Sequence, residues 1–370
     1  MSRSWTSWIG YVVAVWSAVF GAFGVWWSLG GNGFPFGTGD PELMAEPSMA
    51  FKVSLLGWAT PEIAGPVIAV GGFAGAIVAV LMARGSSGAW SRWLLPAYAW
   101  LLAFTLTVGI QDYRTLVVVS YTPVMAIAQL LGLWTNGTGW ADLYLAPRLI
   151  LLMCLVAGIG WALTAIAYRR RVTGSCLTCG RDGVDEPSFV DRWGRLAVWI
   201  AVASPLFYCA TRWAWALGFS LGIDPVAYEA AKEQGLWLAG AALASLGLVG
   251  AVLTLGLTQR WGEVFPRWMI GLRGRRVPPM LAVVPAMFVS VLVVSASFMY
   301  IRIVIIDGIT PATWPLSLPE AFWFVWGAAL FVATLAYLRR RRGRCATCGR
   351  GVADATIAAE RTRPLDSATV

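Results

Sequence analysis

Four cysteines, arranged in two pairs, are the residues of this chain whose type and spacing could do chemistry. Cys176 and Cys179 lie in AYRRRVTGSCLTCGR at 167–181, and Cys345 and Cys348 lie in AYLRRRRGRCATCGR at 336–350. The two segments match at ten of fifteen positions, with a constant offset of 169 residues. Each Cys-x-x-Cys-Gly turn places two thiols on one tight loop, because glycine adopts the positive φ that such a turn needs. Four cysteine sulfurs are a usual ligand set for structural zinc.

The two pairs are too far apart in sequence for a contiguous zinc ribbon, since Cys345 lies 166 positions after Cys179. Both pairs nevertheless follow a long apolar run that ends in tyrosine and arginines, so both should emerge at one membrane face. We therefore predict that all four cysteines hold one structural zinc ion per chain and clamp two halves together. Two alternatives stay open: redox-active pairs, and free cysteines or metal sites formed between chains.

Arg114 and Arg302 are a second candidate pair, because each lies at the end of an apolar run and each precedes a proline by nine residues. An arginine at a helix end commonly extends its charge to the membrane interface. The alternative is a cavity between the halves, because ionisable residues facing a membrane protein's interior are functional candidates. The predicted cavity-lining residues are Asp112, Arg114, Arg302 and Asp307.

The composition indicates a membrane protein. Hydrophobic residues make up 58% of the 370-residue chain and charged residues only 13%, against roughly 25% charged in an average soluble domain. Apolar spans of about 20 residues explain this deficit. The net charge of +9 comes almost wholly from arginines at the ends of apolar runs, as expected for cytoplasmic loops. We therefore expect a lipid bilayer, and no nucleic acid, as the partner.

The apolar runs predict an all-α, polytopic transmembrane helical bundle of about eight spans, organised as two fused four-helix repeats. The segment 115–134, which contains Pro123, is predicted to be re-entrant or to lie on the outer surface. A nine-span alternative would place Arg3, Arg84 and Arg92 on the wrong side of the membrane. The predicted spans are 7–29, 62–83, 93–110 and 148–168, then 196–218, 236–258, 281–302 and 320–337.

The predicted organisation has three parts. Residues 1–183 form the first repeat and 190–350 the second, each ending in a CxxC knuckle, and 351–370 form a disordered cytoplasmic tail. We expect the plasma (inner) membrane, with both termini in the cytoplasm. The arginine- and tryptophan-rich loop 259–279 is expected to be an interfacial segment on the cytoplasmic face, where arginines could contact anionic lipids.

The sequence constrains the function less than it constrains the architecture. The chain has no histidine, which removes the commonest general base, and we expect no enzymatic activity; an enzyme acting on lipid-linked substrates is the alternative. The leading hypothesis is a transporter- or channel-like protein with a cytoplasmic structural zinc clamp. The other is a non-transporting scaffold or regulator whose zinc knuckles and basic loop bind a cytoplasmic protein partner.

Three motifs carry a family resemblance: RRR followed by CxxCGR, RWGEVFPRW at 260–268, and GRRVPP at 274–279. With these motifs the chain resembles, over most of its length, a group of uncharacterised multi-pass membrane proteins from actinomycetes. The resemblance implies a membrane location and a family. It implies no activity and transfers no catalytic or binding residue.

Overall fold

The computed structural model describes residues 5–132, 139–182 and 189–351, and these residues form helices and loops with one isolated β-bridge. Seven of the helices are long and apolar enough to cross a membrane, and a bent pair of helices provides an eighth candidate span. The predicted all-α class and the predicted number of spans are confirmed.

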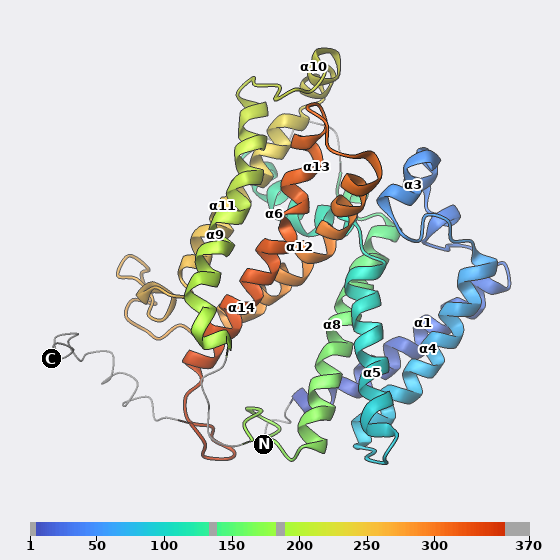
Figure 1. The fold of residues 1–370 in the computed structure, drawn as a ribbon, viewed down its shortest axis with the longest axis vertical. Coiled ribbons are helices and arrows are strands. Elements are labelled where there is room, and N and C mark those ends of the chain that lie inside the picture. Colours follow the sequence, from blue (N-terminus) through green and yellow to red (C-terminus); the bar gives the residue numbers. More distant parts are fainter. Residues whose placement is uncertain (1–4, 133–138, 183–188, 352–370) are drawn as a thin grey trace.

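The first half, drawn in blue to green in Figure 1, contains four long helical units. Short helices lie before α1, between α1 and α4, and before α8. The units are α1 (Ile9–Ser28), α4 (Pro61–Arg84), α5 (Ser91–Phe104) with α6 (Tyr113–Leu130), and α8 (Ala146–Val172); the short elements are η1 (Trp5–Ser7), η2 (Gly37–Gly39), α2 (Pro41–Ala45), α3 (Pro47–Val53) and α7 (Trp140–Leu143).

The second half has the same number of long units. A short helix, α10, follows α9, and Asp224 caps it by accepting hydrogen bonds from two backbone N–H groups. The units are α9 (Phe189–Ala216), α11 (Leu236–Leu255), α12 (Pro279–Asp307) and α13 (Trp314–Ala321) followed by α14 (Trp323–Arg341), with α10 (Pro225–Glu233) and η4 (Arg260–Gly262) between them.

Corresponding helices pack in corresponding pairs. In the first half α1 packs on α4 and α8, and α5 packs on α8; in the second half α9 packs on α11 and α14, and α12 packs on α14. Small residues allow the closest approach, as is common between membrane helices. A Cβ on Gly24 would lie 2.5 Å from the Ala69 nitrogen, so α1 and α4 meet almost backbone to backbone.

The segment predicted to be re-entrant or to lie on the outer surface begins with a break. A π-helical turn, η3 (Thr105–Gly109), follows α5, and α6 then departs at 67°. α6 packs against α11 and α12 of the second half, and Leu116 joins an apolar cluster there with Val293 and Trp323. Through α6, this bent pair therefore packs the first half against helices of the second half.

The helix directions define two faces of the molecule. We call the face where α8 and α14 end the knuckle face, and the face with the 29–60 loop and α10 the loop face; they lie at the bottom and top of Figure 1. The predicted boundary between the halves at 183–190 and the predicted tail at 351–370 fall almost wholly outside the described residues.

Candidate metal centre

The four predicted cysteines meet on the knuckle face, although they come from different halves. The Sγ atoms of Cys176 and Cys345 are 4.0 Å apart, those of Cys179 and Cys348 are 3.6 Å apart, and all four lie within 4.8 Å of one another. Zinc–sulfur bonds of about 2.3 Å in a tetrahedron place sulfurs about 3.8 Å apart. These four thiols can therefore hold a tetrahedral metal ion.

Local backbone geometry builds each knuckle in the same way. The Cys176 N–H donates to the Arg181 carbonyl at 3.0 Å, and the Cys345 N–H donates to the Arg350 carbonyl at 2.8 Å. Gly180 and Gly349 have φ of +76° and +69°, a conformation that strongly favours glycine. The repeated CxxCGR sequence thus closes two equivalent loops.

The knuckles contact each other through equivalent residues. The Thr178 and Thr347 hydroxyls are 3.2 Å apart. The Arg181 guanidinium donates to the Arg350 carbonyl at 3.0 Å, and the Arg350 guanidinium donates to the Arg181 carbonyl at 3.0 Å. Each of these contacts joins residues 169 positions apart, as do the two cysteine contacts. The site therefore has the reciprocal pattern of an isologous two-fold interface.

The residues before each knuckle also make matching contacts. Tyr168 donates its hydroxyl to the Ser86 carbonyl at 2.7 Å, and Tyr337 donates to the Gly262 carbonyl at 2.8 Å. Both tyrosines are buried, and both hold the loop that follows the second long helix of their half.

The arginines beside these tyrosines act on the ends of those same helices. Arg171 donates to the Met82 and Ala83 carbonyls at 3.0 and 2.7 Å, where α4 ends, and Arg340 donates to the Leu257 carbonyl just after α11. Cations are favourable at helix C-termini. These two arginines, expected from the sequence to set topology, therefore also attach α8 and α14, which carry the knuckles, to the ends of α4 and α11.

The thiols are prepared differently for metal binding. Backbone N–H groups of Cys348 and Thr347 lower the pKa of Cys345 to about 6, and the backbone N–H of Cys179 lowers the pKa of Cys176. Burial raises the pKa of Cys179 to about 11. Cys176 and Cys345 are therefore readier thiolates than Cys179, which must release a proton when a cation binds.

The donor set fits zinc better than a hard cation. Thiolates suit soft or borderline metals, whereas magnesium and calcium prefer oxygen ligands. Four thiolates on one Zn²⁺ leave two negative charges, and several arginines of the two segments surround the site, including Arg170, Arg342 and Arg344. The remaining cysteines, Cys154 and Cys209, are buried in separate apolar clusters.

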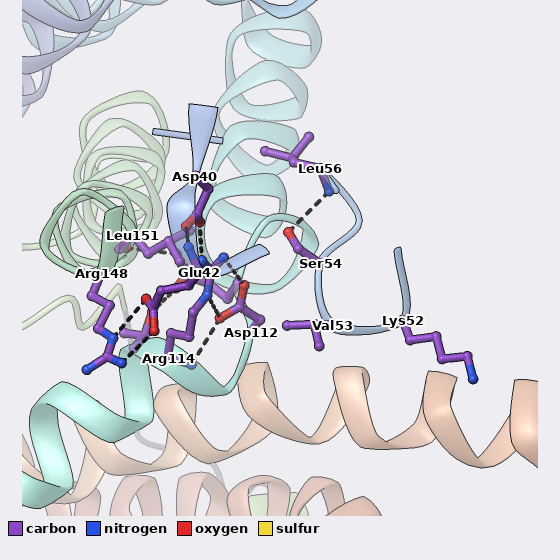
Figure 2. A network of polar contacts seen from close by, with 12 residues as sticks. Asp40, Glu42, Lys52, Val53, Ser54, Leu56, Asp112, Arg114, Arg148 and Leu151 are labelled. Carbon is purple, nitrogen blue, oxygen red and sulfur yellow. Dashed lines mark hydrogen bonds and ion pairs between the residues drawn. The ribbon is translucent and has the colours of Figure 1, made fainter. Parts of the chain in front are cut away.

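The structure also places Arg114, which lies on the loop face within a buried ionic cluster (Figure 2). Its Nε and Nη2 donate to the two carboxylate oxygens of Asp112 at 3.0 and 2.6 Å, and its Nη1 donates to Asp40. Arg114 is 2% exposed, so it does not extend to bulk water as the interfacial alternative required.

Arg302 and Asp307 make different contacts from Arg114 and Asp112. Arg302 donates to the carbonyls of Lys52 and Val53 at 3.0 and 2.7 Å, and Asp307 accepts from the Lys52 ammonium at 2.6 Å. Both sets thus hold the 29–60 loop, and they do so at separate places. That these residues line a shared cavity stays a prediction.

Sequence reasoning missed the loop partners and one further ion pair. Glu42 binds Arg148 at 2.5 Å, beside the Asp40 cluster. Arg212 of α9 pairs with the buried Glu320 of α13 and lies 4.2 Å from the ring centre of Trp215. The available signal was the acidic content of the loop, because arginines at the ends of apolar runs need anions or carbonyls once buried.

Comparisons of this chain with protein-family models, with curated proteins and with solved structures find no match. The resemblance to the actinomycete group therefore stays a prediction.

Proposed function

We propose that this chain is a multi-pass plasma-membrane protein in which one structural zinc ion joins the two halves on the cytoplasmic face, and that it serves as a rigid membrane scaffold. The observation that carries the proposal is the convergence of four thiols, two from each half, within 4.8 Å. A closed four-thiolate site leaves no open coordination position, which is typical of structural rather than catalytic zinc.

Contacts between the two halves at two further places favour a scaffold over a carrier whose halves rock against each other. Within the bundle, the Ser295 hydroxyl of α12 donates to the Thr107 carbonyl of the π-helical turn. On the loop face, Lys52 of the first half pairs with Asp307 of the second. A rocking carrier would have to break contacts on at least one face in each cycle.

The charge distribution supports a cytoplasmic knuckle face. The knuckle face carries both arginine runs and the 259–279 loop, whereas the loop face has four arginines among the described residues. Excess arginine in short loops is characteristic of the cytoplasmic side. The loop-face arginines are Arg114, Arg148, Arg212 and Arg302.

The metal is tested by the zinc content of full-length protein purified without added metal. We expect one zinc per chain, its loss in Cys176→Ser and Cys345→Ser, and its retention in Cys154→Ser, whose thiol is buried far from the knuckles. Zinc that survives both knuckle substitutions, or is absent from the wild type, refutes the clamp.

Rigidity is tested separately by electron paramagnetic resonance distances in lipid nanodiscs. Spin labels attached to an unnatural ketone side chain at Thr38 and Glu229 report on both halves at the loop face without using cysteine chemistry. The scaffold predicts one narrow distance distribution that broadens when zinc is chelated. Two populations in the zinc-loaded protein would instead indicate a moving carrier.

Transport remains the second candidate, because one observation favours it. The Arg212–Glu320 ion pair joins two different candidate spans, and ionisable residues inside membranes commonly mark ion or proton pathways. Proton flux into liposomes that contain the protein, abolished by Glu320→Gln, would favour transport. Equal flux in protein-free liposomes would leave the scaffold.

A further inference from the structure

An apolar pocket lies at the knuckle-face end of the second half, beneath the arginine- and tryptophan-rich loop. Its volume is about 450 Å³, within the roughly 300–1,000 Å³ typical of ligand pockets. Residues of α11, α12 and α14 form its walls, and the loop covers it with Trp261, Phe265, Pro266, Trp268 and Met269.

The loop that covers the pocket is an ordered structure. A β-bridge joins Val264 to Arg276, and the Phe265 N–H donates to the Arg275 carbonyl at 3.0 Å. Arg341 of α14 donates to the Val277 carbonyl at 2.9 Å. The pocket is therefore preformed, so a ligand would not have to order the loop on binding.

Two polar side-chain groups at the pocket have partners within the protein, whereas the buried Nε1 of Trp326 has none among the described residues. The Thr254 hydroxyl donates to the Gly250 carbonyl at 2.8 Å, and Trp261 Nε1 donates to Gln259 at 2.6 Å. The pocket thus offers apolar surface for a hydrocarbon chain and little that would orient a polar molecule.

Exposed apolar residues extend from the pocket across the adjacent surface. Ile270, midway along the loop, is 99% exposed and Trp268 is 77% exposed, while Met280 and Leu281 at the start of α12 are also exposed. Tryptophan and aliphatic side chains in this arrangement are characteristic of segments at the lipid–water interface. The pocket therefore lies where membrane lipid can reach it.

The charge of the loop favours an anionic head group. Within 256–278 the only acidic residue is Glu263, against five arginines. Arg267 lies between the lining residues Pro266 and Trp268 in sequence, and Arg267, Arg273 and Arg275 are exposed. Arginine binds phosphate oxygens bidentately.

We propose that this pocket holds an acyl chain of an anionic phospholipid, whose phosphate is bound by Arg267, Arg273 and Arg275. The apolar walls select a hydrocarbon chain, and the arginines select a net negative lipid over a zwitterionic one. This site is independent of the zinc clamp and of scaffold or transport activity.

The test is native mass spectrometry of full-length protein in detergent, with phosphatidylglycerol and phosphatidylcholine of identical chains at equal concentration. Wild type should retain phosphatidylglycerol about tenfold or more over phosphatidylcholine. A tenfold preference corresponds to about 1.4 kcal/mol, which three arginines near an anionic head group can supply. The triple variant Arg267→Gln/Arg273→Gln/Arg275→Gln should lose this preference, whereas Arg84→Gln/Arg92→Gln, on the same face in the first half, should keep it.

The chain-binding part is tested with Ala286→Trp, which fills the pocket, against Val284→Trp, which adds the same ring at a 60% exposed position of α12. Only Ala286→Trp should lose the retained lipid. Equal retention of both lipids by wild type, or full retention in both the arginine and Ala286→Trp variants, overturns the proposal. Because the three arginines are exposed, their variant remains informative even if Ala286→Trp does not fold.

Discussion

Replacing Arg114 by methionine should be among the most destabilising substitutions on the loop face. Methionine keeps much of the length of arginine but removes the charge that two buried carboxylates share. Asp40 and Asp112 are 0 and 1% exposed, and Arg114 makes three side-chain hydrogen bonds to them. Without it, two negative charges remain close together in a site that water does not reach.

The expected cost is about 3–5 kcal/mol, the usual effect of removing one partner from a buried ion pair. The lost hydrogen bonds and the repulsion between the two carboxylates both contribute to this cost, because neither carboxylate can reach water to compensate.

The assay is unfolding of the detergent-purified protein in sodium dodecyl sulfate, followed by tryptophan fluorescence. Lys52→Met is the matched control, because its ion pair with Asp307 is partly exposed at 28 and 35% and should contribute at most about 1 kcal/mol. Adding Asp40→Asn and Asp112→Asn to Arg114→Met should recover much of the loss, since no buried charge then lacks a partner. A loss of stability in Arg114→Met no greater than that in Lys52→Met would contradict the expected cost of the unpaired carboxylates.

Three further outcomes follow from the geometry. Gly24→Ala should destabilise the α1–α4 contact by about 1–3 kcal/mol through overpacking, whereas Gly71→Ala, which meets nothing within 4 Å, should be neutral or stabilising in the same unfolding assay. Arg171→Gln should lower the free energy of unfolding by about 1–3 kcal/mol, because α4 carbonyls lose their charged donor. Arg169→Gln, on the exposed side of α8, is the control, and an equal loss of stability there would contradict that explanation. Zinc titrated into metal-free protein at pH 7.5 should release at least one proton, because the pKa of Cys179 is raised to about 11, and zinc affinity should therefore rise with pH. Calorimetry in buffers of different ionisation enthalpy counts the released protons. No proton release would contradict a protonated Cys179 thiol in the metal-free protein.

The sequence was sufficient for the cysteines because two local rules act together. Glycine after the second cysteine closes each knuckle, and the helix before it ends at the same membrane face in both halves. Topology then brings Cys176 and Cys345 together without any detailed knowledge of packing. The internal repeat itself stays a prediction, supported by equivalent contacts such as those of Tyr168 and Tyr337.

The ionic cluster on the loop face could not be predicted in the same way. Asp112 is two residues from Arg114, so that contact is local. Asp40 lies 74 residues away on an irregular loop, and no periodicity in such a loop says where it returns to the bundle. The same holds for Lys52, which meets Asp307 across 255 residues. Charge requirements indicated that partners must exist but did not identify them.

The reciprocal contacts at the metal centre have a consequence for the concentration dependence of the protein. Contacts in which each residue meets its own counterpart, as Arg181 and Arg350 do, are those that two identical subunits make across a dyad. Joining such subunits in one polypeptide replaces a second-order encounter by an intramolecular one, with an effective concentration in the millimolar range for short linkers. The site then assembles at any expression level, even in a sparsely populated membrane. Residues of one polypeptide that lie away from the dyad need not match their counterparts, and Arg114 and Arg302 bind different partners.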